Sequence, residues 1–285
     1  MELGRDHLIR ATTLQLKMIH LLTTISSTCP KPIRMHQCAV CVDNRKFQIN
    51  FNQKSGRGAF SRKFLPRKET LTVNFPFAWV LRSIYLDSKC STCFESHTAG
   101  RSTENNLFRC SSCKKVMYCG RKCQKRDWQQ HRAECSHLNR LQSTFGNSSK
   151  LDDVVLILRA ISICKSSSPE CKLQHSASNS VICGGTHFQQ LSDFGVNERE
   201  TISPDDIAVI HAVNEISSID INEIARILRL FRGNNFGITD SLLNCVGVGI
   251  YPLAAILNHS CSPNCVLRFG FSSDGPSIEV HSVSR

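Results

Sequence analysis

The sequence predicts an α+β fold in which strand-rich segments near both ends of the chain enclose a cysteine-rich segment and a helical region. Apolar and polar residues alternate over 47–81 and again over 234–285, a pattern typical of strands. Closely spaced cysteines and a histidine occupy residues 90–135. Long apolar runs with helix-capping residues between 138 and 232 predict helices.

Length, charge and cysteine content narrow the class of protein. A chain of 285 residues allows one or two domains. Its formal charge of +12 indicates either acidic partners, nucleic acid among them, or a solvated basic surface. Sixteen cysteines indicate disulfides outside the cell or metal ligands inside it. The apolar stretch 14–25 is interrupted by Lys17 and His20 and is too short to cross a membrane, so we expect an intracellular chain with reduced cysteines.

The first strand-rich segment follows residues 1–46, an extension that we leave unassigned. A helix-like stretch lies near 8–25, and Cys38 and Cys41 form a lone C-x-x-C pair without a second pair at metal-site spacing, so we interpret it as a chance pair. Within 47–81, Gly56-Arg57-Gly58 separates two runs of strand residues. A Gly-x-Gly turn lets the backbone approach a ligand closely, although most such turns are simple hairpins.

Residues 90–135 carry eight potential metal ligands. Their spacing is C-x2-C-x16-C-x2-C-x5-C-x3-C-x7-H-x3-C, which supplies two complete tetrahedral zinc sites, one of four cysteines and one of three cysteines with a histidine. All eight ligands are protein side chains, which predicts structural rather than catalytic zinc. A helix expected over 121–134 places His131 and Cys135 on one side, where they can share a metal. The residues are Cys90, Cys93, Cys110, Cys113, Cys119, Cys123, His131 and Cys135.

The helical region contains three predicted helices. Val154–Ile163 has the length and apolar density of a buried helix. Ser203 followed by Pro204 predicts a capped helix start, and Asp220 predicts another, whose helix ends at Gly233. His211 is expected to be a partly buried structural histidine, and the serine-rich stretch 166–186 is expected to be a loop.

The second strand-rich segment ends in a dense group of polar side chains. Residues 246–250 alternate as in a strand and are followed by the apolar stretch 253–257. Five polar or metal-capable side chains come next, and each costs about 1–3 kcal/mol if it is buried without a partner. They must therefore bond to backbone, ligand or metal. This polar knot consists of Asn258, His259, Ser260, Cys261 and Asn264, and a hairpin is expected over 265–283.

These motifs together resemble a known family. Asn-His-Ser-Cys-x-Pro-Asn, preceded by Gly-x-Gly-x-Tyr-Pro, resembles the signature of SET-domain lysine methyltransferases, and specifically of the family in which a MYND zinc finger interrupts the SET domain. The resemblance implies a split β-rich SET domain with an inserted double-zinc MYND finger and a helical insert. The expected boundaries are 1–46 for the extension, 47–84 for the first SET segment, 85–138 for the finger, 139–233 for the helical insert and 234–285 for the second SET segment.

The same resemblance implies the roles of individual residues. In the interleaved MYND pattern, the first and third ligand pairs bind one zinc ion, here Cys90, Cys93, Cys119 and Cys123. The second and fourth pairs bind the other, here Cys110, Cys113, His131 and Cys135. The implied contacts to S-adenosylmethionine are Gly56, Arg57, Gly58, Asn234, Asn258 and His259. In the family, Cys261 would be a ligand of a third zinc ion.

Two parts of the family pattern are not found in the chain. Members end the SET domain with a tyrosine that orients the substrate amine, and then supply three cysteines that complete the third zinc site. The chain stops at Val283-Ser284-Arg285, which we interpret as a truncation before both parts, so the catalytic residue is unknown. Tyr251 does not occupy the terminal position, although it could form part of the pocket wall.

Two functions follow as expectations. The first is an S-adenosylmethionine-dependent protein-lysine methyltransferase that acts on histone or other protein lysines, as a monomer and chromatin regulator in the nucleus and cytoplasm. The second is a catalytically inactive adaptor whose MYND finger recruits protein partners in transcriptional regulation. Such fingers typically bind proline-rich peptides. The basic run Lys114, Lys115, Arg121, Lys122, Lys125 and Arg126 is more often a solvated face than a nucleic-acid site, and no membrane partner is expected.

Overall fold

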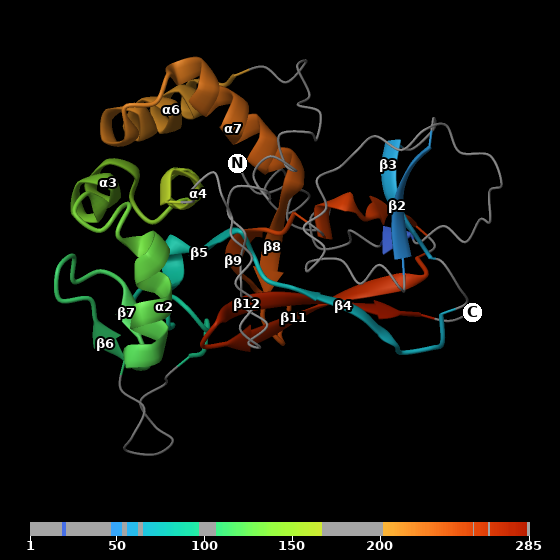
Figure 1. Cartoon of the computed structure of the whole chain (residues 1–285). Coiled ribbons are helices and arrows are strands. Elements are labelled where there is room, and N and C mark those ends of the chain that lie inside the picture. Colours follow the sequence, from blue (N-terminus) through green and yellow to red (C-terminus); the bar gives the residue numbers. More distant parts are fainter. Residues whose placement is uncertain are drawn as a thin grey trace, which may run out of the picture. The chain divides into compact units, whose positions relative to one another are not determined.

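The computed structural model describes residues 19–20, 47–52, 56–61, 65–96, 107–166, 202–252, 254–261 and 263–283 (Figure 1). The chain divides into two compact units. The first unit comprises Met1–Asn74, Leu253–Gly270 and Ile278–Arg285, and the second comprises Phe75–Pro252 and Phe271–Ser277. The Cys38–Cys41 pair and nearly all of the serine-rich stretch lie outside the described residues.

The first unit is built from strands. Strands β2 (Phe47–Asn52) and β3 (Gly56–Ser61) pair antiparallel from Phe47 with Ser61 to Asn52 with Gly56. The turn expected at Gly56-Arg57-Gly58 is wrong, because these residues pair with β2 as the first part of β3. A five-stranded sheet has the order β10-β1-β11-β12-β4. Its strands are β1 (Ile19–His20), β4 (Thr70–Asn74), β10 (Asn258–His259), β11 (Cys265–Ser272) and β12 (Gly275–Ser282), of which the end of β11 and the start of β12, within Phe271–Ser277, belong to the second unit.

The N-terminal extension supplies one short strand of this sheet. Ile19 pairs with both His259 and Cys265, so β1 lies between β10 and β11. The helix expected near 8–25 is therefore wrong at these two residues, and the rest of that stretch lies outside the described residues. Backbone pairing with two strands outweighs the weak local helix propensity of this segment.

The second unit contains a three-stranded antiparallel sheet of order β5-β9-β8. Its strands are β5 (Ala78–Leu81), β8 (Asn235–Thr239) and β9 (Cys245–Ile250). All four residues of β5 are buried. Phe77, Trp79, Leu81 and Tyr251 are among the largest fully buried side chains, so the core of this unit lies around the sheet.

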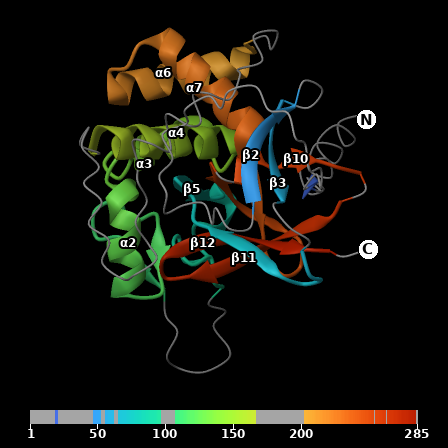
Figure 2. The same ribbon diagram turned by 45° about the vertical axis from the view of Figure 1, so that its right-hand side comes forward.

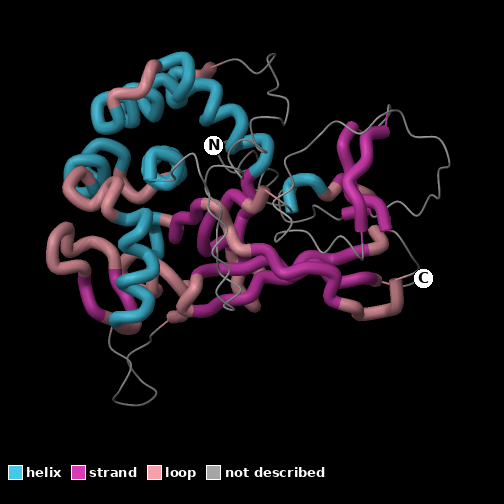
Figure 3. Tube along the Cα trace, in the orientation of Figure 1, coloured by secondary structure: helices cyan, strands magenta, loops and turns pink. Residues whose placement is uncertain are grey.

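The α-helices that the structure describes all belong to the second unit (Figure 3). The central one is α4 (Ser149–Ser166), which packs against β5 and lies beneath α6 (Pro204–Ser217) (Figure 2). Every residue from Val154 to Ile161 is buried, which confirms the predicted buried helix. The other helices are α2 (Arg121–His131), α3 (Leu138–Phe145) and α7 (Ile221–Asn234), and the short 3-10 turns are η1 (Ser83–Tyr85) in this unit and η2 (Ala254–Ile256) in the first.

The helix starts predicted from sequence are confirmed. The Ser203 side chain accepts a hydrogen bond from the Asp206 backbone N–H, the Asp206 side chain accepts from Ser203, and Pro204 is the first helical residue. Asp220 accepts from the backbone of Asn222 and Glu223 at the start of α7. The prediction for His211 is wrong, because this side chain is exposed on α6. None of the helices in the described part of the chain is both long and apolar enough to cross a membrane.

Candidate metal centre and cofactor site

Two groups of metal-capable side chains lie in the second unit. The first group contains Cys90, Cys93, Cys119 and Cys123, and the second contains Cys110, Cys113, His131 and Cys135. The four ligand atoms within each group lie within 4.8 Å of one another. The structure thus brings the eight residues together in the interleaved arrangement of the MYND pattern. All four ligands of the second group are buried, whereas in the first group Cys119 is half-buried and the other three are buried.

The distances within the groups fit a tetrahedral zinc ion. Zinc–sulfur bonds of about 2.3 Å place tetrahedral sulfur atoms about 3.8 Å apart, and a sulfur and an imidazole nitrogen about 3.6 Å apart. The Sγ atoms of Cys93 and Cys119 are 3.7 Å apart, and those of Cys110 and Cys135 are 3.8 Å apart. Cys113 Sγ lies 3.5 Å from His131 Nε2. These distances are far longer than a disulfide bond, and the donor set is the one that zinc prefers.

The thiols within each group shift one another's pKa values. Burial raises the pKa of the Cys113 thiol, but hydrogen bonds from His131 and from the backbone of Val116 and Lys115 bring it down to about 6. In the first group, hydrogen bonds from Cys123 and Cys93 lower the pKa of Cys90, whereas the pKa of Cys123 is raised because Cys90 ionises first. A divalent ion would let all four thiols ionise together. The finger therefore binds zinc through these two clusters.

Two tight turns and one helix position the ligands. Phe94 N–H bonds to Cys90 O, and Lys114 N–H bonds to Cys110 O, so the two C-x-x-C turns have the same backbone pattern. The residue after each pair, Phe94 or Lys114, has a positive φ of 59° or 58°. A short ladder of β6 (Phe108–Arg109) and β7 (Met117–Tyr118) leads to Cys119, and α2 then carries Cys123 and His131.

The finger packs directly on the three-stranded sheet. A Cβ atom added at Gly247 on β9 would lie 2.2 Å from the Phe94 ring and 2.8 Å from the Val80 carbonyl oxygen. Only glycine leaves room there for the aromatic ring that follows Cys93. Arg126 on α2 donates to the Asp274 carbonyl oxygen at 2.9 Å and lies over the Trp79 ring at 5.3 Å. The sequence interpretation of Arg126 as part of a solvated basic face is therefore wrong for this residue.

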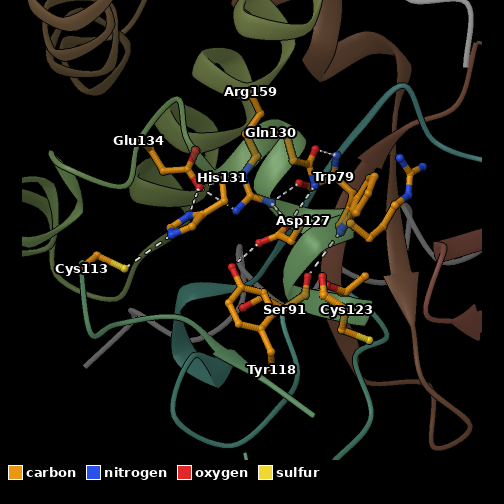
Figure 4. Close-up of polar contacts among 12 residues, drawn as sticks. Trp79, Ser91, Cys113, Tyr118, Cys123, Asp127, Gln130, His131, Glu134 and Arg159 are labelled. Atoms are coloured by element: carbon orange, nitrogen blue, oxygen red, sulfur yellow. Dashed lines mark hydrogen bonds and ion pairs between the residues drawn. The ribbon is translucent and has the colours of Figure 1, made fainter. Parts of the chain in front are cut away.

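A buried polar network surrounds His131 (Figure 4). His131 Nδ1 is 2.9 Å from Glu134 Oε1, and Arg159 on α4 binds that same oxygen through Nε at 2.9 Å and Nη2 at 2.6 Å. Arg159 Nη1 also donates to Asp127 Oδ1 at 3.2 Å and to the Trp79 carbonyl oxygen at 2.8 Å. Tyr118 donates its hydroxyl to Asp127 Oδ2 at 2.8 Å, where burial first and the Asp127 charge second raise the tyrosine pKa.

The polar knot lies in the first unit. Asn258 and His259 form β10, which pairs with β1, and Asn258 is half-buried whereas His259 is exposed. His259 Nε2 lies 3.3 Å from Cys261 Sγ. The backbone carbonyl oxygen of Asn264 accepts a hydrogen bond from the Val283 backbone N–H at 2.8 Å, which holds the end of β12 beside the knot.

The Gly56-Arg57-Gly58 segment of β3 and the knot meet in this unit. A Cβ atom added at Gly58 would lie 2.7 Å from Asn258 Nδ2. Gly58 is buried, and Gly56, Arg57 and Gly58 lie together at the start of β3. Glycine at position 58 therefore lets the β3 backbone approach the Asn258 amide closely, which is the type of approach that ligand-binding turns require.

Three further residues that were considered for the cofactor, substrate or third zinc site do not contact Gly58 or the Asn258 amide in the described contacts. Asn234 is the last residue of α7, in the second unit, and its amide donates to the Leu230 carbonyl oxygen at 2.8 Å. Tyr251 is fully buried against Phe236 and donates its hydroxyl to the Pro276 carbonyl oxygen at 3.2 Å. Cys261 is exposed, and within the described residues it belongs to no group of three metal-capable side chains.

Sequence reasoning missed Glu134, Arg159 and Phe94. Arg159 is a lone charge inside the apolar run 154–163, a signal that it has buried partners. Glu134 follows His131 by three residues, a spacing at which side chains can meet, although α2 ends at His131 and Glu134 lies in the turn after it rather than in the helix expected to 134. Phe94 carries no comparable signal, because its partner glycine lies 153 residues away along the printed sequence.

Comparisons with known proteins agree with this geometry. Residues 90–135 match the family pattern of the MYND finger. The histone-lysine N-methyltransferase ASHR1 of Arabidopsis thaliana is 30% identical over 221 residues, or 77% of this chain and 43% of that protein. N-lysine methyltransferase SMYD2-B of Danio rerio is 29% identical over 198 residues (68% and 41%), and SMYD2 of Homo sapiens is 26% identical over 209 residues (73% and 44%). The chain spans less than half the length of these relatives.

Proposed function

We propose that this chain, which belongs to the family of lysine methyltransferases with a SET domain and a MYND finger, forms part of a protein-lysine methyltransferase that uses S-adenosylmethionine. The names of the relatives support the transfer of methyl groups to lysine, and to histone lysine in the plant relative. Since the chain spans less than half of them, activity, cofactor and substrate are all parts of the proposal.

The contact between Gly58 and Asn258 carries the cofactor part of the proposal. These residues lie far apart in the sequence, in the first and second strand-rich segments, and the family resemblance assigns both to the cofactor. A side chain at position 58 would displace the Asn258 amide, because its Cβ atom would lie 2.7 Å from Asn258 Nδ2. The Gly56–Gly58 backbone and the Asn258 amide then present hydrogen-bonding groups to one ligand, with His259 exposed at the adjacent position. Asn234 belongs to the proposed set by resemblance.

Methyl transfer to lysine needs alignment more than acid–base chemistry. When bound, S-adenosylmethionine supplies a methyl group on a positively charged sulfur. The chain's own residues would hold that cofactor so that a neutral lysine amine meets the methyl carbon in line with the sulfur. Such positioning contributes about 7–11 kcal/mol in well-oriented reactions. Of the three tyrosines, none is assigned to the reaction: the hydroxyls of Tyr118 and Tyr251 donate to Asp127 and to the Pro276 carbonyl oxygen, and Tyr85 lies in η1 with Lys89 over its ring.

Calorimetric titration of the zinc-loaded chain with S-adenosylmethionine tests the proposal. Asn258→Ala should weaken binding by roughly 10-fold, because a lost ligand hydrogen bond costs about 1–3 kcal/mol. Gly58→Ala should weaken it as well, because the added methyl group displaces the Asn258 amide. Asn244→Ala is the matched control, since this asparagine lies in the exposed β8–β9 turn, where it bonds to Asp240.

The possible results separate the two functions. Binding that is unchanged by Asn258→Ala removes this residue from the cofactor site. No binding by a folded, zinc-loaded chain contradicts the cofactor proposal and favours an adaptor that acts through its MYND finger. Binding with the expected losses leads to methyl-transfer assays on histone and other protein substrates.

Partners and location belong to the same proposal. The expected substrates are histones or other proteins with accessible lysines, and the finger is expected to bind proline-rich peptides. The formal charge of +12 is compatible with acidic partners, nucleic acid included. We propose action as a monomer in the nucleus and cytoplasm, as a regulator of chromatin.

A further inference from the structure

The second metal group has a neighbour from outside the ligand set. Glu134 Oε1 lies 2.9 Å from His131 Nδ1, and the exposed fractions of the two side chains are 1% and 0%. The other ring nitrogen, Nε2, lies 3.5 Å from Cys113 Sγ within the ligand group. A Nδ1–H donated to the carboxylate leaves Nε2 with a free lone pair for the metal. The carboxylate therefore fixes both the tautomer and the ring orientation of the histidine ligand.

Arg159 holds that carboxylate in place. Its Nε and Nη2 both bind Glu134 Oε1, and its Nη1 binds Asp127 and the Trp79 carbonyl oxygen (Figure 4). Its side chain is 3% exposed, so these bonds form away from water. One guanidinium thus forms hydrogen bonds to two buried carboxylates. Removal of such a partner leaves uncompensated charge in the interior, which is costly.

Arg159 does not belong to the finger whose histidine ligand it helps to position. The MYND finger ends at residue 135, whereas Arg159 lies in the middle of α4. Among the described residues, its partner Glu134 bonds directly to a ligand side chain of the second group, His131, whereas its partners Asp127 and Trp79 bond to Tyr118 and Ser91, which are not ligands of the first group. The two metal groups of one finger therefore differ in their dependence on the rest of the unit.

We infer that Glu134 and Arg159 are positioning residues of the second zinc site, so that retention of this zinc ion depends on the docking of α4 while retention of the first does not. The site is completed by a helix outside the finger. Its zinc ion in turn stabilises the contact of α4 with the carbonyl group of Trp79 on β5.

The test uses the full chain loaded with cadmium-113. Cadmium replaces zinc in thiolate sites, and its NMR resonance separates a site of four sulfur ligands from one of three sulfurs and a nitrogen. Glu134→Gln keeps the shape of the side chain and removes its charge, and Arg159→Met removes the guanidinium. Arg126→Met is the matched control, because this arginine contacts Trp79 and Asp274 and does not contact His131.

We expect both variants to shift or broaden only the resonance of the mixed sulfur and nitrogen site. Release of zinc from that site to a chromogenic chelator should accelerate about 10- to 100-fold, the usual effect of losing an outer-sphere partner. The first site should release zinc at the wild-type rate in both variants, and Arg126→Met should leave the mixed site unchanged.

Two results would overturn the inference. One is a mixed-site resonance and release rate that do not change in Glu134→Gln. The other is equal acceleration at both sites, which would show general loosening of the unit. If Arg159→Met does not fold, Glu134→Gln decides the question, with Arg159→Lys expected to retain zinc better than Glu134→Ala.

Discussion

At the residue scale, Asp152 is a buried carboxyl group that accepts a hydrogen bond from a backbone N–H and has a raised pKa. Its carboxylate on α4 accepts from the Ser83 N–H at 2.8 Å and lies 3.5 Å from Arg82 Nε. Burial raises the pKa of this carboxyl from 3.8 to about 6, although the hydrogen bond from Ser83 and the charge of Arg82 oppose the rise. The side chain thus fixes the η1 turn while its charge disfavours folding.

This shift predicts a pH-dependent effect of Asp152→Asn. Between pH 3.8 and about 6 the folded state holds more protons at this site than the unfolded state, so its contribution to stability falls as pH rises through that window. Asparagine keeps the acceptor for Ser83 and has no charge to desolvate. We expect the free energy of unfolding of Asp152→Asn, relative to wild type, to increase by roughly 1 kcal/mol from pH 5.5 to 7.5.

Denaturant unfolding at the two pH values, with zinc saturating, measures this difference. Asp152→Ala serves as the comparison, because it also loses the acceptor for the Ser83 N–H and should be destabilised at both pH values. A difference between Asp152→Asn and wild type that is the same at both pH values would contradict the raised pKa.

Individual residues were predictable where spacing alone defines the chemistry. The pairing of the ligands in residues 90–135 required the family resemblance, since spacing allows several partitions of eight donors. Glu134 and Arg159 required knowledge of which helix covers the finger, which is a tertiary fact. The contact of the Phe94 ring with Gly247 likewise could not be predicted, because it joins a loop and a strand that meet only in the folded chain.

At the element scale, local capping signals and tertiary packing agree over most of the chain. The starts of α6 and α7 are encoded by side chains that bond to the first-turn backbone. Strand alternation predicted β9, and the Gly-Pro hairpin signal predicted the connection of β11 to β12. Burial on α6 was less predictable. The apolar side chain of Ile207 is 48% exposed, whereas the charged side chain of Asp206 is buried. Asp206 can be buried because Arg232 from α7 bonds to it.

The cap of α6 provides a test at this scale. Ser203→Ala removes the side-chain acceptor of the capping box, which lies 3.2 Å from the Asp206 N–H, and leaves that donor only the Ser203 carbonyl oxygen at 3.0 Å. We expect a loss of about 1 kcal/mol in the free energy of unfolding, the usual effect of removing a serine cap. Equilibrium denaturation followed by far-ultraviolet circular dichroism measures it.

Ser143→Ala is the control for this substitution. Ser143 lies within α3, is exposed, and donates only to the Asn139 carbonyl oxygen one turn earlier. Alanine there should change stability by less than about 0.5 kcal/mol, because exposed positions away from caps tolerate it. Equal effects of the two serine substitutions would mean that the capping box does not stabilise α6.

At the scale of the whole chain, the zinc finger and the sheet of the second unit share one core. Trp79 on β5 donates its indole N–H to the Ser91 carbonyl oxygen at 3.3 Å, and Ser91 lies between two ligands of the first metal group. The Phe94 ring packs on Gly247, and Arg159 joins α2, α4 and β5. Strand and helix segments could be predicted from sequence, but this shared core could not, because it consists of long-range contacts.

Removal of zinc should therefore unfold the second unit as a whole. Structural zinc contributes about 10–16 kcal/mol of binding free energy, which equals or exceeds the total stability of a typical domain. Trp79 is 2% exposed and Trp128 is 48% exposed, and they are the two tryptophans of the chain. In a Trp128→Phe background, a strong chelator should shift the fluorescence of Trp79 to longer wavelength as this ring becomes hydrated. Added zinc should reverse the shift. Because Trp79 contacts Arg126 and Ser91 of the finger, far-ultraviolet circular dichroism is followed in parallel. Retention of the helical signal of α4, α6 and α7 after chelation would mean that unfolding is confined to the finger, and would separate the core of the finger from the core of the sheet.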